Sequence, residues 1–126
     1  MNPLEEKKKL IVLIEDDASL KAMYMTVLSK SGYDVRPAPD GDLGLDLIRE
    51  LDWDLLLLDI MLPVKDGISL LKTMEVEKLK KGKIVMLTNL NNDNIIQDAF
   101  KYGADGYIIK SDVTPGSLLD EVKAFF

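Results

Sequence analysis

The chain has 126 residues, of which 47% are apolar and 30% charged, and its formal net charge is −6. This length suits one domain with a single core, and the composition is ordinary for a globular protein, so extended disorder is not expected. The negative charge argues against a protein that binds nucleic acid through its phosphates.

The chain contains neither cysteine nor histidine. The missing cysteine excludes disulfides, thiolate metal sites and thiol catalysis. The missing histidine excludes serine–histidine triads, most zinc sites and a phosphohistidine within the chain. Any bound metal should therefore be a hard cation such as Mg²⁺ held by oxygen ligands. Residues 1–9 do not resemble a secretory signal, and apolar runs such as Leu55–Leu58 are too short to cross a membrane, so we expect a cytoplasmic protein with no membrane partner.

In the first half of the chain, short apolar runs alternate with segments of helical spacing. Leu10–Ile14 has strand length, and the stripe after it has a helical period: Leu20, Met23, Tyr24, Val27 and Leu28. Gly32 is expected to end this helix. Tyr33–Ala38 predicts a short strand, which its prolines place near a sheet edge. Asp40 is expected to cap a second helix with the apolar face Leu43, Leu47, Ile48 and Leu51.

The second half of the chain repeats this alternation. The predicted strands are Leu55–Asp59, Lys83–Thr88 and Gly106–Lys110, and the predicted helices are Gly67–Leu79, Asn92–Tyr102 and a last one opened by Thr114 and Pro115. Gly103 is expected to end the fourth helix. Five apolar strands alternating with five helices predict an α/β protein with a parallel sheet covered on both faces.

Polar side chains stand at the predicted carboxyl ends of four of these strands. They are Glu15, Asp16 and Asp17 after the first strand, Asp59 at the end of the third, Thr88 at the end of the fourth and Lys110 at the end of the fifth. Ligands of such sheets bind at this edge, and carboxylates with a lysine suit magnesium and a phosphoryl group. Each residue alone has an ordinary structural explanation, and a helix cap is the better interpretation of Asp17. Their joint occurrence favours a site.

The segments IVLIEDD, LLLLDIMLPVKDG, IVMLTN and GADGYIIK, in this order and spacing, resemble the receiver domains of bacterial response regulators, and in particular stand-alone receivers of the chemotaxis-regulator type. The similarity covers the chain from residue 9 onward, with residues 1–8 as an N-terminal flank. The resemblance implies a three-layer, doubly wound, flavodoxin-like fold with five parallel strands in the order 2-1-3-4-5 and five helices.

The resemblance also implies a role for each matching residue. Asp59 would be the phosphoacceptor, with Lys110 pairing with it and Thr88 binding a phosphoryl oxygen. Asp16, Glu15, Asp59 and the backbone carbonyl of Met61 would hold Mg²⁺. Tyr107 would be an aromatic switch following Thr88, although a tyrosine on a strand is more often part of the packing. Pro63 and Gly67 would shape the loop after Asp59.

Two positions depart from the family pattern. Ser111 replaces the proline that normally follows the lysine. A cis peptide bond between Lys110 and Ser111 would cost roughly 3–4 kcal/mol, so we expect a trans bond and a re-routed loop that keeps Lys110 aimed at Asp59. Asn89 replaces a small residue, and we expect it to narrow access to Asp59 or to hydrogen-bond near it. Because the given sequence shows no output domain after the last helix, we expect a receiver of the stand-alone type.

The main hypothesis is therefore a signalling domain that is not an enzyme, although it could catalyse its own phosphorylation and dephosphorylation. The expected phosphodonor is a histidine kinase or a histidine phosphotransfer protein. The expected output partner is a protein that binds the face of the fourth helix, fifth strand and fifth helix. A homodimer on phosphorylation is a further possibility, and no direct contact with nucleic acid is expected. A phosphorelay intermediate and an inactive pseudo-receiver scaffold remain alternatives. A flavin-binding protein is disfavoured because Glu15–Ala18 would repel a phosphate. An aspartate-nucleophile phosphatase is disfavoured because Met61 stands where its general acid would be.

Overall fold

The computed structural model of the chain describes residues 8–62, 65–89 and 93–126. The elements are β1 (Leu10–Ile14), α1 (Ala18–Lys30), β2 (Asp34–Ala38), α2 (Gly41–Glu50), β3 (Leu55–Asp59), α3 (Gly67–Glu77), β4 (Lys83–Thr88), α4 (Asp93–Lys101), β5 (Gly106–Ile109), a 3₁₀ turn η1 (Lys110–Asp112) and α5 (Pro115–Lys123). The strands form one parallel sheet in the order β2-β1-β3-β4-β5. The predicted fold class and strand order are confirmed.

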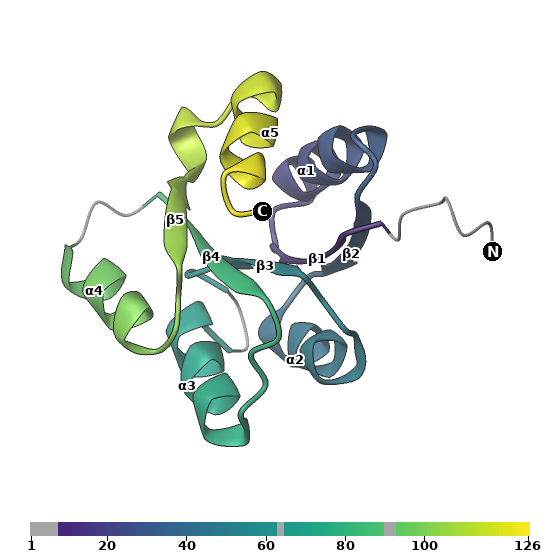
Figure 1. Ribbon diagram of the computed structural model, residues 1–126. Helices are drawn as coiled ribbons and strands as arrows, with labels where there is room; N and C mark the ends of the chain where they lie inside the picture. The colour runs from purple at the N-terminus through teal and green to yellow at the C-terminus, as the bar shows by residue number, and fades with distance from the viewer. Residues whose placement is uncertain (1–7, 63–64, 90–92) are drawn as a thin grey trace.

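The sheet is the middle of three layers (Figure 1), with α1 and α5 on one face and α2, α3 and α4 on the other. Successive residues of a strand point to opposite faces. In β1, Ile11 and Leu13 accordingly pack with α1 and α5, while Val12 and Ile14 pack on the other face. All four side chains are fully buried, which explains why the strand reads as an uninterrupted apolar run.

The edge position predicted for the second strand is confirmed. β2 pairs with β1 and forms one edge of the sheet, and Pro37 stands opposite Leu13 in that pairing. A proline lacks the N–H that a ladder needs, so an edge strand tolerates it best.

Helix boundaries follow local capping chemistry. The side chain of Asp17 caps α1 by accepting a hydrogen bond from Leu20 N–H, and Asp40 caps α2 in the same way. Thr114 and Ser117 form a capping box at the start of α5. Gly32 and Gly103 follow α1 and α4 with φ values of +95° and +108°, a left-handed conformation that glycine adopts most easily. These caps and stops match the sequence predictions.

A few boundaries differ from those predicted. β2 begins at Asp34, one residue later than expected. α3 ends at Glu77 because Lys78 takes a left-handed conformation as its C-cap. β5 ends at Ile109, since Lys110 already belongs to the 3₁₀ turn. The predicted start of the fourth helix at Asn92 lies outside the described residues. No helix in the described ranges is long and apolar enough to cross a bilayer.

Candidate functional site: an acidic cluster at the carboxyl edge of the sheet

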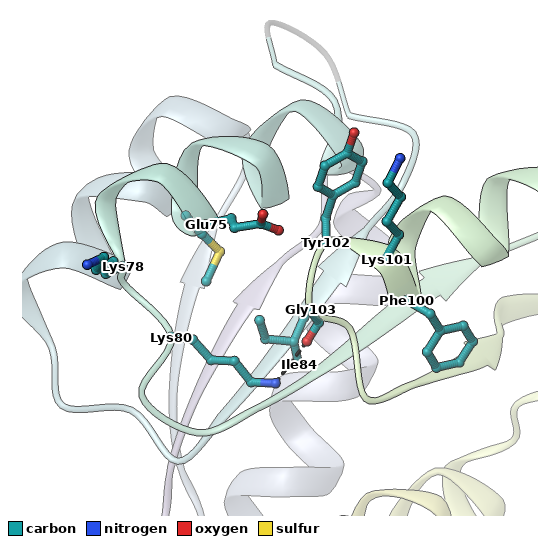
Figure 2. A pocket seen from close by; sticks show the side chains of 9 residues that line it. Glu75, Lys78, Lys80, Ile84, Phe100, Lys101, Tyr102 and Gly103 are labelled. Carbon is teal, nitrogen blue, oxygen red and sulfur yellow. Dashed lines mark hydrogen bonds between the residues drawn. The ribbon is translucent and has the colours of Figure 1, made fainter.

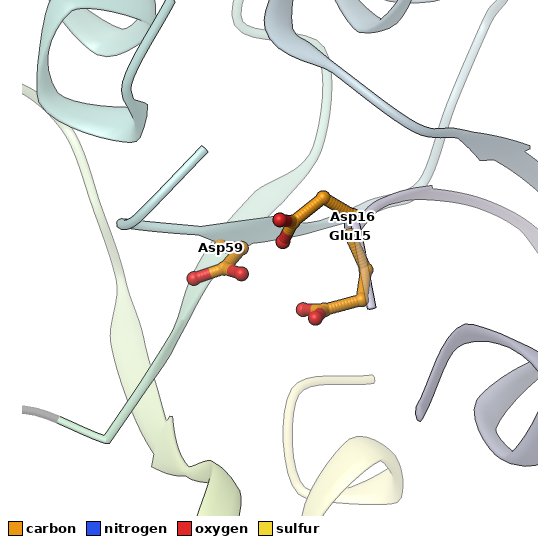
Figure 3. Close-up of side chains that lie close together, drawn as sticks. All are labelled: Glu15, Asp16 and Asp59. Atoms are coloured by element: carbon orange, nitrogen blue, oxygen red, sulfur yellow. The ribbon is translucent and has the colours of Figure 1, made fainter. Parts of the chain in front are cut away.

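Three carboxylates meet where β1 and β3 end. Ile14 is paired with Leu58 across these strands, so Glu15 and Asp59 follow as neighbours, and Asp16 comes next along the chain. Figure 3 shows the three side chains turned toward a common region, where one oxygen from each lies within 4.8 Å of the others. In the sheet, β2 lies on one side of β1 and β3 on the other, so the order of the strands reverses at β1. Doubly wound sheets bind their ligands at this switch point.

Asp59 is held in place by two different donors. Its side chain is almost completely buried at the end of β3. Oδ1 accepts a hydrogen bond of 3.0 Å from the backbone N–H of Met61, and Oδ2 accepts one of 2.9 Å from Nζ of Lys110. These contacts fix the carboxylate group.

Lys110 reaches this cluster from the end of β5. Its Nζ lies 2.9 Å from Oε1 of Glu15 and 2.9 Å from Oδ2 of Asp59. Burial of the ammonium acts to lower the pKa of Lys110, but the hydrogen bonds and charges of Glu15 and Asp59 outweigh it and raise the pKa overall. Lys110 is therefore a firmly charged cation between two buried acids.

The buried carboxyl group of Glu15 is only partly compensated. Burial raises its pKa from 4.5 to about 7; the hydrogen bond from Lys110 acts in the opposite direction, and the charge of Asp59 raises the pKa further. Oε1 is bonded to Lys110, whereas Oε2 is buried with no hydrogen-bond partner in the described part of the chain. An unsatisfied buried carboxylate oxygen among three acids fits a hard divalent cation that takes oxygen ligands.

Thr88 and Tyr107 lie on the neighbouring strands. Thr88 ends β4 and is buried, and Leu87 before it pairs with Asp59. Tyr107 on β5 is 45% exposed, and its ring makes an edge-to-face contact with Phe100 of α4 at a centroid distance of 6.4 Å. The tyrosine is therefore a surface residue in this structure, so the interpretation as core packing is wrong.

The loop after β3 depends on Gly67. Its N–H donates a hydrogen bond of 2.9 Å to the carbonyl of Ile60. A Cβ at this position would lie 2.5 Å from the backbone carbonyl oxygen of Asp59, so only glycine allows this close approach. Gly67 thus shapes the loop as predicted. Pro63, the other residue expected to do so, lies outside the described residues.

The peptide bond between Lys110 and Ser111 is trans, as are the other peptide bonds of the described residues. The chain turns through η1 directly after β5, and Lys110 still reaches Asp59. The expected trans bond is confirmed, and Lys110 stays aimed at Asp59 as expected, whereas the re-routing of the loop stays a prediction. Asn89 is exposed next to Thr88, and its effect on access stays a prediction.

Sequence reasoning missed two features near the cluster. The sequence predicts Tyr24 of α1 only as part of the apolar stripe, yet its hydroxyl is buried with no hydrogen-bond partner in the ranges described. Burial and the charge of Glu15 raise the pKa of Tyr24 to about 12. The sequence signal that could have indicated a buried hydroxyl is the presence of a tyrosine within an otherwise aliphatic stripe. The backbone N–H of Met61 as a donor to Asp59 left no signal in the sequence.

Comparison with known proteins agrees with this geometry. The sequence model of the protein family described as the response regulator receiver domain matches residues 11–123. The chain is 35% identical over 121 residues to the DNA-binding response regulator MtrA of Mycobacterium tuberculosis, which covers 96% of this chain and 52% of MtrA. It is 38% identical over 109 residues to the transcriptional regulatory protein RstA of Escherichia coli, covering 86% and 44% of the two chains. The chain thus spans about half the length of these curated relatives.

Solved structures show the same similarity. The chemotaxis response regulator CheY4 of Vibrio cholerae superposes with a TM-score of 0.87 at 25% identity, covering 95% of this chain and all of CheY4. A CheY-like receiver domain protein of Methanospirillum hungatei reaches 0.85 at 31% identity, covering 94% and 93%. The chain belongs to the response regulator receiver domain family, whose members are phosphorylation-controlled signalling domains of two-component systems rather than classical enzymes.

Proposed function

We propose that Asp59 is the phosphoacceptor and that it receives its phosphoryl group from a phosphohistidine of a histidine kinase or phosphotransfer protein. The observation that carries this proposal is the position of Asp59: buried at the end of β3, bonded to Lys110 at 2.9 Å and flanked by Glu15 and Asp16. The donor histidine must come from another protein because the chain contains none.

The transfer moves the phosphoryl group from a histidine nitrogen of the donor to a carboxylate oxygen of Asp59. An oxygen of the Asp59 carboxylate attacks phosphorus, a new O–P bond forms, and the P–N bond of the donor breaks with its electron pair going to the histidine nitrogen. Lys110 offsets charge on the phosphoryl oxygens, and the hydroxyl of Thr88 donates a hydrogen bond to one of them. Positioning and charge compensation are what such transfers require. Attack by water on phosphorus would later return Asp59 and release inorganic phosphate, so the domain would catalyse its own dephosphorylation.

Glu15, Asp16, Asp59 and the backbone carbonyl of Met61 would hold Mg²⁺. The ion supplies positive charge near the phosphoryl oxygens when bound. The converging carboxylates and the unpaired Oε2 of Glu15 support this assignment. Calorimetric titration with Mg²⁺ tests it: Asp16→Ala should bind the ion much more weakly than the wild type. Equal affinity would place the ion elsewhere.

Output would use the face of α4, β5 and α5. Thr88 drawn toward the phosphoryl group would open space for the ring of Tyr107, which now lies exposed against Phe100. An output protein, or a second phosphorylated copy in a homodimer, would recognise the altered face. We place this signalling in the cytoplasm, where histidine kinases present their phosphohistidine.

Amide chemical shifts test the switch. With Mg²⁺ and beryllium fluoride, a phosphoryl mimic, the wild type should shift at β4, α4 and β5, whereas Asp59→Asn should not. Shifts confined to α1 and α2 would contradict the proposed output face. Equal shifts in the Asp59→Asn protein would contradict the assignment of Asp59.

A further inference from the structure

A pocket of about 360 Å³ opens between the carboxyl-terminal ends of α3 and α4. Figure 2 shows its lining, which combines the end of α3, the start of β4 and the end of α4. Ile84 lies near the first residue of β4 and Thr88 is its last, so the pocket is at the opposite end of this strand from Asp59. It is separate from the phosphorylation site.

The pocket has an apolar floor and an aromatic wall. Met74 and Ile84 are buried beneath it and belong to the core of this sheet face. Phe100 and Tyr102 of the α4 end complete the lining, and Phe100 is 43% exposed. An exposed phenylalanine beside an apolar hollow offers area that a bound side chain could bury.

The rim of the pocket is basic. Lys80 is fixed by hydrogen bonds of 2.9 Å to the carbonyl of Gly103 and 3.1 Å to Asp105. Lys101 lies over the ring of Tyr102, 5.6 Å from its centroid, and Lys78 is exposed at the C-cap of α3.

Charge on the rim is opposite in sign to the charge of the whole chain. Three lysines line the pocket, and one of them, Lys80, is ion-paired with Asp105 at 2.9 Å. The other two are Lys78 and Lys101, and Lys72 adds a cation 5.2 Å from the centroid of the Tyr102 ring. Among the described residues, these three cations face one lining carboxylate, that of Glu75. The chain as a whole carries −6. A local excess of positive charge on an acidic protein attracts an acidic ligand to the pocket, while the negative charge elsewhere disfavours binding of that ligand to the rest of the surface.

We propose that this pocket is a docking site for an acidic peptide segment of a partner protein, with one apolar side chain seated on Met74, Ile84 and Phe100 and carboxylates facing the lysine rim. A nucleic acid fits less well because a long phosphate polymer would extend past this rim onto a chain whose net charge is −6, whereas a short acidic segment contacts the rim alone. The buried anchor would supply most of the binding energy, and the complementary charge would supply specificity.

The pocket is connected to the proposed switch through one side chain. Phe100 lines the pocket and also contacts the ring of Tyr107 at 6.4 Å. A movement of Tyr107 on phosphorylation would alter the wall on which the anchor sits, and docking would in turn favour one position of Tyr107. This coupling rests on the proposed function, whereas docking itself does not.

Fluorescence anisotropy with labelled synthetic peptides tests docking. The probe is an acidic peptide with a central Leu-Phe pair, and the two control probes are the same peptide with Gly-Ser in place of that pair and a single-stranded oligonucleotide. The acidic Leu-Phe peptide should bind, salt should weaken it, and Lys101→Glu should weaken it about tenfold or more. Lys30→Glu is the matched control, because both lysines are exposed in the last turn of a helix.

Equal losses in Lys101→Glu and Lys30→Glu, tighter binding of the oligonucleotide, or no binding of the Leu-Phe peptide would overturn the proposal. Equal binding of the Gly-Ser peptide and the Leu-Phe peptide would contradict the part of the proposal that seats an apolar side chain in the pocket. Beryllium fluoride with Mg²⁺ should change the peptide affinity of the wild type and leave that of Asp59→Asn unchanged. Docking without this change would overturn the coupling alone.

Discussion

Replacing Glu15 with glutamine should stabilise the metal-free protein, and the gain should depend on pH. Glu15 is completely buried, and its pKa of about 7 in the folded protein lies above its ordinary value of 4.5, mainly because burial penalises the charged form. Glutamine keeps the shape of the side chain without the charge. The change therefore removes a buried carboxylate that Lys110 compensates only in part.

The sign and size follow from the two pKa values. Well below pH 4.5, Glu15 is protonated in both the folded and the unfolded chain, so its ionisation costs the folded state nothing. Between 4.5 and about 7 the unfolded chain ionises first, and the wild type loses stability as the pH rises. At 1.36 kcal/mol for each pKa unit, the loss reaches about 3 kcal/mol above pH 7. The glutamine variant should escape this loss.

Urea unfolding in EDTA, followed by circular dichroism from about pH 4 to about pH 8, measures the difference. Glu15→Gln should match the wild type at the acidic end and exceed it by up to about 3 kcal/mol at the basic end. Asp17→Asn is the control, because Asp17 is an exposed helix cap and asparagine caps as well. A gain that is independent of pH, or an equal gain in Asp17→Asn, would refute the reasoning. Added Mg²⁺ should reduce the gain by stabilising the wild type.

Three further substitutions test separate contacts by urea unfolding. Lys110→Met should destabilise the metal-free protein by about 3 kcal/mol near neutral pH, because it leaves two buried carboxylates without their cation; an unchanged stability would contradict this. Lys81→Met should cost about 1 kcal/mol, because Nζ bonds three carbonyls at the end of α2, and no loss would mean that solvent replaces these bonds. Gly67→Ala should cost more than about 1 kcal/mol and slow phosphorylation, because its Cβ would press on the carbonyl of Asp59. Gly116→Ala, with open space around it, is its control, and equal effects of the two would argue against the clash.

The sequence was sufficient for the architecture because local chemistry determines most of it. The uninterrupted apolar run of β3 is buried at every position, and Asp40 and Thr114 cap their helices as predicted. The end of α3 was less predictable, since the left-handed Lys78 carries no glycine or asparagine signal.

The convergence of Lys110 on Asp59 could be anticipated from strand ends alone, because parallel strands end at one edge. The hydrogen-bond partner of each carboxylate oxygen could not be anticipated. Lys110 also bonds Oε1 of Glu15, and the backbone N–H of Met61 donates to Oδ1 of Asp59. The exposed ring of Tyr107 contacts Phe100 of α4, and a contact between a strand and a helix cannot be derived from the strand pattern alone. The basic pocket rim joins Lys80 and Lys101 from different segments. Such features arise only when the tertiary structure forms.

The central claim is that Asp59 forms a covalent bond to a phosphoryl group, and intact-mass spectrometry tests it most directly. The wild type, Asp59→Asn and Asp16→Ala would each be incubated with acetyl phosphate, a small phosphodonor, in Mg²⁺ and in EDTA. The wild type should gain the mass of one phosphoryl group in Mg²⁺ and little in EDTA, Asp16→Ala should gain little in either, and Asp59→Asn should gain none. Labelling of Asp59→Asn to the extent of the wild type would contradict the account.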